Sequence, residues 1–98
     1  MIFAIICKDK PGHLETRMGT RPQHLDYLNG LNENGTLKFA GPFLDAEGKP
    51  CGSLVAIEAE NEAAAGVIAA ADPYALAGLF ESFEIRAWNW VFNNPENA

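Results

Sequence analysis

The sequence predicts an α+β fold in which four strands and two helices follow the order β-α-β-β-α-β. An apolar segment at residues 2–7 and a long alternating segment at residues 80–92 both have strand character. The segments between them comprise two with helical and two with strand periodicity, separated by turn residues. A chain of 98 residues has room for one domain, so we expect residues 1–98 to form a single α+β domain.

The first half of the chain contains two predicted strands and one long helix. Residues 2–7 are uniformly apolar and rich in β-branched types, which is typical of a strand covered on both faces. A helix is predicted over residues 14–32, where apolar side chains recur at Leu14, Met18, Leu25, Leu28 and Leu31. Pro22 either kinks this helix or marks the first turn of its main part. The second strand covers residues 36–40, and we expect Gly41 and Pro42 to stop it.

The second half repeats the pattern with a shorter helix. The predicted segments are a loop at 45–50, a strand at 53–59, a helix at 61–71, a further helical turn at 74–78, a strand at 80–92 and a polar tail at 93–98 that we expect to fray. Asn61 is a suitable cap for the alanine-rich helix. Asp72 ends that helix because it precedes Pro73, and a residue before proline disfavours the α region.

This order of elements is that of the ferredoxin-like fold, a four-stranded antiparallel sheet with both helices on one face. The alternating directions of the elements bring three connections to one end: residues 8–16, 41–52 and 72–79. Loops on a rigid scaffold are where functional sites are usually built. We therefore expect the polar chemistry at that end.

Composition excludes several classes of function. The formal net charge is −6, from seven Lys and Arg against thirteen Asp and Glu, which argues against nucleic acid or an anionic membrane as the main partner. No apolar run has the length of a membrane span, and the apolar start lacks the features of a signal peptide. Two cysteines do not make a disulfide framework. We expect a cytoplasmic protein.

The last predicted strand has large apolar side chains on both faces. Alternation places Phe83, Ile85, Ala87 and Val91 on one face, and Glu84, Arg86, Trp88, Trp90 and Phe92 on the other. Only one face can meet the helices, and an exposed aromatic patch usually marks an interface. We expect a homodimer that packs the open sheet faces together through Trp88, Trp90 and Phe92. The alternative is that the tail or a long loop covers this patch.

Three polar side chains share one stripe of the first helix. Arg17, Arg21 and His24 are separated by four and three residues. Histidine can exchange a proton near neutral pH, and arginines one turn away can hold an anionic substrate. The alternative is that His24 only caps the edge of the core and both arginines are solvated.

Asp72 is expected to approach this stripe. The second helix ends at Asp72, beside the start of the antiparallel first helix. A carboxylate beside an imidazole fixes its tautomer. The alternative role for Asp72 is a simple helix stop before Pro73.

The remaining candidates are weaker. His13 is either a second proton carrier or, as we favour, a surface residue. No spacing among His13, His24, Cys7 and Cys51 matches a known zinc pattern, so no metal site is predicted. Both cysteines fall at the same end of the sheet, where we expect them to be thiols.

The chain resembles the YciI-like (YCII-related) family. The resemblance covers nearly the whole chain, and the matching stretches are Leu14-Glu15-Thr16-Arg17, Arg21-Pro22-Gln23-His24-Leu25, Ala40-Gly41-Pro42, Ala71-Asp72-Pro73-Tyr74 and Ala77-Gly78-Leu79. Members of that family have the ferredoxin-like fold and form dimers of the α+β barrel type. Their catalytic histidine and aspartate match His24 and Asp72. The family is similar to muconolactone isomerases and includes a dehydrochlorinase that acts on a chlorinated hydroxyquinol.

The resemblance implies proton-transfer chemistry without a cofactor, on a small ring or lactone-like substrate. In this hypothesis His24 is the general base and Asp72 orients it. Arg17 or Arg21 binds an anionic oxygen, Tyr74 donates a hydrogen bond, and Gly41 with Pro42 forms a pocket wall. Two other classes stay open: a small-molecule binding or sensing module without catalysis, and an accessory subunit with a vestigial pocket.

Overall fold

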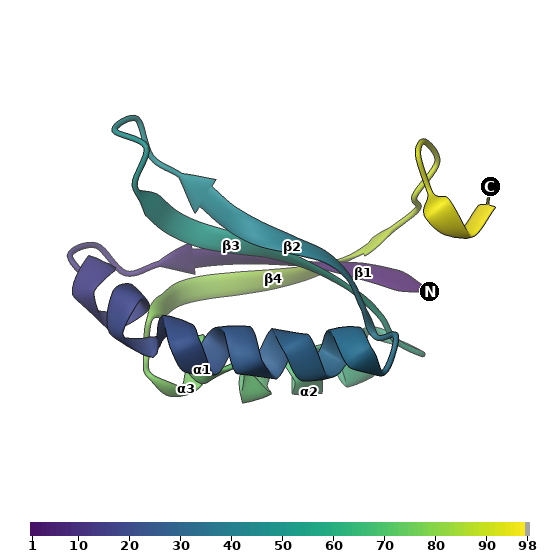
Figure 1. Cartoon of the computed structure of the whole chain (residues 1–98), viewed down its shortest axis with the longest axis horizontal. Helices are drawn as coiled ribbons and strands as arrows, with labels where there is room; N and C mark the ends of the chain where they lie inside the picture. The colour runs from purple at the N-terminus through teal and green to yellow at the C-terminus, as the bar shows by residue number, and fades with distance from the viewer. Residues whose placement is uncertain (98) are drawn as a thin grey trace.

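A computed structural model describes residues 1–97 and contains one four-stranded antiparallel sheet in the order β2-β3-β1-β4. The elements are β1 (Ile2–Asp9), α1 (Leu14–Glu33), β2 (Leu37–Leu44), β3 (Pro50–Glu58), α2 (Glu62–Ala71), α3 (Pro73–Leu76), β4 (Phe80–Trp88) and the 3₁₀ turn η1 (Pro95–Asn97). Helices α1 and α2 lie on the same side of the sheet (Figure 1). The predicted α+β, ferredoxin-like fold is confirmed.

The central strand β1 determines which side chains face the helices. Phe3, Ile5 and Cys7 alternate along β1 and are all buried in the helix-facing core. Val55 and Ile57 of β3 lie in the same core, which Leu28 closes from α1. Ala65 and Ala69 are buried on α2, where their small side chains let the helix approach the sheet closely.

Both long helices begin and end close to the predicted residues. Asn61 caps α2 as expected, because its side-chain oxygen accepts a hydrogen bond of 2.8 Å from the amide of Ala64. Pro22 lies inside α1, which continues to Glu33. The amide groups of Asn34 and Gly35 close the end of α1 onto the carbonyls of Gly30 and Asn32.

Four strand boundaries differ from the prediction by two residues or more: β1 continues to Asp9 and β3 begins at Pro50, and the larger differences are in β2 and β4. Gly41 and Pro42 do not stop β2, which continues to Leu44 opposite β3. An edge strand tolerates proline because only one of its sides must pair. β2 is one of the two edge strands of this sheet. The fourth strand is shorter than predicted and ends at Trp88. Trp88 pairs with Ile2, so the neighbouring strand supplies no partner for residues 89–92.

The sheet face opposite the helices carries an aromatic cluster. The Trp88 ring centroid lies 5.5 Å from that of Phe39 and 5.8 Å from that of Trp90, and Phe39 meets Trp90 edge to face at 5.0 Å. Trp88 is nevertheless 41% exposed, and Phe92, beyond the strand, is 83% exposed. The segment after β4 therefore covers part of this face through Trp90 and leaves the rest open. Within residues 1–97, no helix is both long and apolar enough to cross a membrane.

Candidate active site

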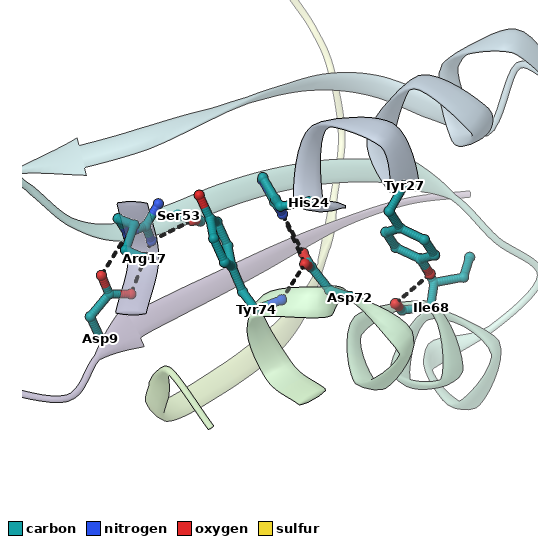
Figure 2. A network of polar contacts seen from close by, with 8 residues as sticks. All are labelled: Asp9, Arg17, His24, Tyr27, Ser53, Ile68, Asp72 and Tyr74. Carbon is teal, nitrogen blue, oxygen red and sulfur yellow. Dashed lines mark hydrogen bonds and ion pairs between the residues drawn. The ribbon is translucent and has the colours of Figure 1, made fainter. Parts of the chain in front are cut away.

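His24 and Asp72 meet between α1 and the junction of α2 with α3. The Nδ1 atom of His24 lies 2.8 Å from Oδ1 and 3.0 Å from Oδ2 of Asp72 (Figure 2). The two residues are 7% and 6% exposed, although 48 positions separate them in the chain. An ionised carboxylate has no hydrogen to donate and can only accept hydrogen bonds. With Asp72 ionised, His24 therefore donates to it through Nδ1.

Asp72 is held by the local structure that ends α2. Its backbone is extended, with φ −60° and ψ 130°, as expected before Pro73. Its Oδ1 accepts a hydrogen bond of 2.9 Å from the amide of Tyr74 and so caps α3. The two roles that the sequence left as alternatives, a helix terminator and a partner of His24, are combined in one side chain.

Tyr74 fills the space between His24 and Arg17. Its ring stacks on the imidazole with the centroids 3.9 Å apart and the planes inclined by 16°. The guanidinium carbon of Arg17 lies 4.6 Å from the centroid of the same ring, and Figure 2 shows the ring between the Arg17 and His24 side chains. Burial raises the pKa of Tyr74 against the opposing charges of Arg17 and Arg21, so it is a neutral phenol at physiological pH.

Arg17 is already paired within the protein. Its Nε and Nη2 atoms donate to the two carboxylate oxygens of Asp9 at 2.7 and 2.9 Å, and Nη2 also donates to the Ser53 hydroxyl at 2.8 Å. Burial alone would lower the pKa of Arg17, but the hydrogen bond and charge of Asp9 outweigh it and leave that pKa raised. Arg17 therefore stays positively charged at every physiological pH.

A cavity of about 480 Å³ adjoins these groups, between α1 and strands β2 and β3. Its polar lining consists of Arg17, Arg21, His24, Ser53 and Tyr74. Its apolar lining consists of Met18, Leu25, Leu28, Ala40, Gly41, Pro42, Leu44, Pro50 and Val55. One edge of the His24 ring therefore meets Asp72, while the side chain also borders the cavity.

The structure brings most of the predicted site residues to this cavity. Arg17, Arg21, His24, Tyr74, Gly41 and Pro42 all line it, and Asp72 lies directly behind His24. Arg21 is exposed at the cavity, in contrast to the buried Arg17. The sequence analysis missed two polar neighbours, Asp9 and Ser53. Period-2 alternation could have found both, because Asp9 continues the buried face of β1 and Ser53 that of β3.

The other candidate residues lie outside this arrangement. His13 is not buried, and its Nδ1 lies 2.9 Å from the carbonyl oxygen of Pro11. Cys7 and Cys51 are both free, the first buried and the second exposed. Burial and the charge of Asp72 raise the pKa of Cys7 to about 12, so it is an unreactive thiol at neutral pH. Among residues 1–97, no group of three or more His, Cys, Asp and Glu side chains is placed to hold a metal ion.

The fold and this cavity define a class of protein: a ferredoxin-like α+β domain with a buried histidine–carboxylate contact beside a small, mostly apolar cavity. Residues 1–89 match the YCII-related domain, and the chain belongs to that family. The chain is 36% identical to protein YciI of Escherichia coli O6:H1, an alignment that covers 94% of this chain and all of the relative. It is also 39% identical to the derivative of benzaldehyde biosynthesis cluster protein C of Emericella nidulans, over 66% of this chain and 74% of that protein.

One solved structure combines sequence similarity with a similar fold. It is TftG of Burkholderia phenoliruptrix AC1100, a 5-chloro-2-hydroxyhydroquinone dehydrochlorinase, in complex with 2,5-dihydroxybenzoquinone. The two chains are 31% identical and superpose with a TM-score of 0.85, over 96% of this chain and 99% of TftG. The two chains therefore share their fold over nearly their whole length.

Proposed function

We propose that this protein is a cofactor-independent enzyme that moves a proton on a small, anionic, ring-shaped or lactone-like substrate, with His24 as acid–base and Asp72 as its orienting partner. The observation that carries the proposal is the contact of 2.8 Å between His24 Nδ1 and Asp72, at the wall of a cavity. A histidine held in this way by a carboxylate is the arrangement that general acid–base catalysis uses.

The hydrogen bond determines which nitrogen does the chemistry. Because Asp72 accepts a hydrogen bond from Nδ1, the neutral imidazole carries its proton there and keeps a free electron pair on Nε2. In the proposed mechanism Nε2 accepts a proton from the bound substrate. Asp72 stabilises the imidazolium that forms, and the same proton is then returned to another substrate atom.

Charge and shape assign the remaining roles. Arg17 is neutralised by Asp9, whereas Arg21 is exposed at the cavity, so in this proposal Arg21 attracts the anionic oxygen of the substrate. Tyr74 donates a hydrogen bond from its neutral hydroxyl. Gly41 and Pro42 form an apolar wall, against which a flat ring can lie. The volume of about 480 Å³ suits a small ligand.

The similarity to TftG supports a hydroxylated aromatic ring as the first substrate to try. Removal of HCl from a chlorinated hydroxyquinol needs no oxidant, because the products are a hydroxybenzoquinone and chloride with a proton. A base takes a proton from a ring hydroxyl and delivers it to the carbon that bears chlorine. Loss of chloride and of a second hydroxyl proton then gives the quinone. One histidine that both accepts and donates a proton can catalyse this sequence.

The proposal is tested by assaying chlorinated hydroxyquinols and small unsaturated lactones with the wild-type protein and with His24→Gln. Loss of the acid–base group is expected to lower kcat by about 10²–10⁴-fold. His13→Gln is the matched control, because His13 lies outside the cavity, and it should retain wild-type turnover. Full activity of His24→Gln would refute the mechanism. Ligands that bind in calorimetry and are never converted would instead support the binding-module alternative.

We also propose that two copies of the chain pair through their open sheet faces. The support is the exposed aromatic side chains of this face: Trp88 of the aromatic cluster is 41% exposed on β4, and Phe43 is 42% exposed on β2. Trp88→Glu places a charge on this face and should convert a dimer to a monomer in sedimentation-velocity experiments at micromolar concentration. Val67→Glu is the control, because Val67 is also apolar and is 72% exposed, but it lies on α2. A wild-type monomer would contradict the proposal.

A further inference from the structure

The aromatic ring of Tyr74 is the most enclosed part of the candidate site. Tyr74 is only 1% exposed, and its two faces are occupied by different groups. His24 stacks almost parallel to one face, with 3.9 Å between the centroids, and Arg17 lies 4.6 Å from the centroid (Figure 2). A hydroxyl that only contacts a substrate would not require this enclosure of the whole ring.

Helix geometry explains how the ring is enclosed. Arg17 and His24 are seven residues apart on α1, which places them two turns and about 10 Å apart along the helix axis. Side chains at this spacing point to the same side of the helix. The gap between them accommodates one flat ring, and α3, more than 40 residues further along the chain, supplies it.

The backbone of the same residue holds the other member of the pair. The Tyr74 amide donates a hydrogen bond of 2.9 Å to Oδ1 of Asp72, the oxygen that also lies 2.8 Å from His24. One residue therefore restrains the carboxylate through its amide and the imidazole through its ring. On the far side, Arg17 is fixed by two hydrogen bonds to Asp9 and cannot move away from the ring without breaking them.

We propose that Tyr74 is a positioning residue, which fixes the plane of the His24 imidazole through its ring while Arg17 and Asp9 support that ring from behind. The phenol hydroxyl is not needed for this role. The kinetic consequence rests on the proposed function, but the effect on the imidazole does not.

The first test is ¹⁵N NMR of the His24 imidazole, which distinguishes the tautomers without any substrate. Wild type and Tyr74→Phe should both show one tautomer, with the proton on Nδ1. Tyr74→Leu keeps the backbone amide, and with it the contact between His24 and Asp72 that fixes the tautomer, but removes the flat ring. The resonances of the His24 ring should therefore shift and broaden as its plane becomes mobile. A wild-type ¹⁵N pattern in Tyr74→Leu would overturn the inference.

The second test uses whichever substrate the wild type converts. Tyr74→Leu should lower kcat by about threefold to tenfold, the worth of one stacked aromatic pair, and change KM less. Tyr74→Phe should recover most of that kcat but keep a raised KM, because it restores the ring and not the hydroxyl contact to substrate. Equal losses of kcat in the Phe and Leu variants would show that the hydroxyl, and not the ring, matters.

Two further variants keep the inference falsifiable. If Tyr74→Leu does not fold, Arg17→Lys replaces it, since lysine keeps the charge beside Asp9 but cannot stack flat against the ring. Arg17→Lys should make the plane of the His24 imidazole more mobile, as Tyr74→Leu does, and so change its ¹⁵N resonances in the same way. An unchanged ¹⁵N pattern would count against the proposal. Tyr27→Phe is the matched control, because its hydroxyl donates to the carbonyl of Ile68, away from the cavity. If no substrate is found, the proposed function fails while the NMR experiment still decides the role of Tyr74.

Discussion

Two pairs, each of a carboxylate with a basic side chain, flank the Tyr74 ring, and they differ in what they can do. Asp9 with Arg17 and Asp72 with His24 are both buried, and each contains at least one contact below 3 Å. The guanidinium cannot release a proton, and its raised pKa makes its charge permanent. An imidazole, unlike a guanidinium, has both a neutral and a protonated form. The comparison teaches that similar geometry gives one pair a fixed charge and lets the other exchange a proton in the function proposed above.

The largest expected effect comes from breaking the permanent pair. Arg17→Met leaves the Asp9 carboxylate buried without a partner, which should lower the free energy of unfolding by about 3–5 kcal/mol. Urea denaturation measures this loss. Arg21→Met removes an exposed arginine from the same helix and should change stability by less than about 0.5 kcal/mol. Equal effects of the two substitutions would show that the Arg17 pair is not structural.

A smaller effect on stability is expected from the pair of Asp72 with His24. Two substitutions of Asp72 should separate its effect on turnover from its effect on stability. Asp72→Asn keeps an oxygen to cap α3 but replaces the carboxylate, so turnover should fall by about 10²-fold or more while stability changes little. Asp72→Ala removes the cap as well and should cost about 1 kcal/mol more in the free energy of unfolding. Kinetic assays measure the loss of turnover, and thermal and urea unfolding measure the loss of stability. If Asn and Ala are equally destabilising, the cap contributes nothing.

The smallest expected effect is seen at Cys7, whose pKa responds to both pairs. Burial and the charges of Asp72 and Asp9 raise that pKa, and Arg17 opposes them. A thiol with a pKa of about 12 is protonated at pH 8, so a thiolate-specific reagent should label Cys51 and spare Cys7 in the native protein. Asp72→Asn removes one of the raising charges and should slightly quicken labelling of Cys7 relative to Cys51. Equal labelling of both thiols in the wild type would contradict this.

Much of the fold was predictable because its signals are local. The helix over Leu14–Glu33, the Asn61 cap and the element order all follow from periodicity, capping and turn residues. The ends of β2 and β4 are not determined by local sequence signals, because they depend on pairing with neighbouring strands. Pro42 is tolerated only because β2 is at the edge, and β4 ends at Trp88 because β1 begins opposite it.

Most residues of the candidate site could be named from the sequence. Their contacts with one another were harder to predict. The topology brings His24 and Asp72 to the same end of the fold, and they lie 2.8 Å apart. The sequence offered Arg17 or Arg21 as the residue that binds the substrate, and in the structure Asp9 pairs with Arg17. Which of two arginines on one helix stripe is neutralised depends on the neighbouring strand, and spacing along the helix contains no information on that.

The irregular edge strand has a consequence for how copies of this chain can associate. Pro42 has no amide hydrogen to offer, and the register of β2 shifts at both Leu37/Phe39 and Phe43/Leu44. A strand interrupted in these ways is a poor template for a further strand. This edge of the sheet therefore resists edge-to-edge pairing with the sheet of another copy. The pairing of sheet faces proposed above does not use this border, and such a pairing of two copies is a closed assembly and not an open fibre.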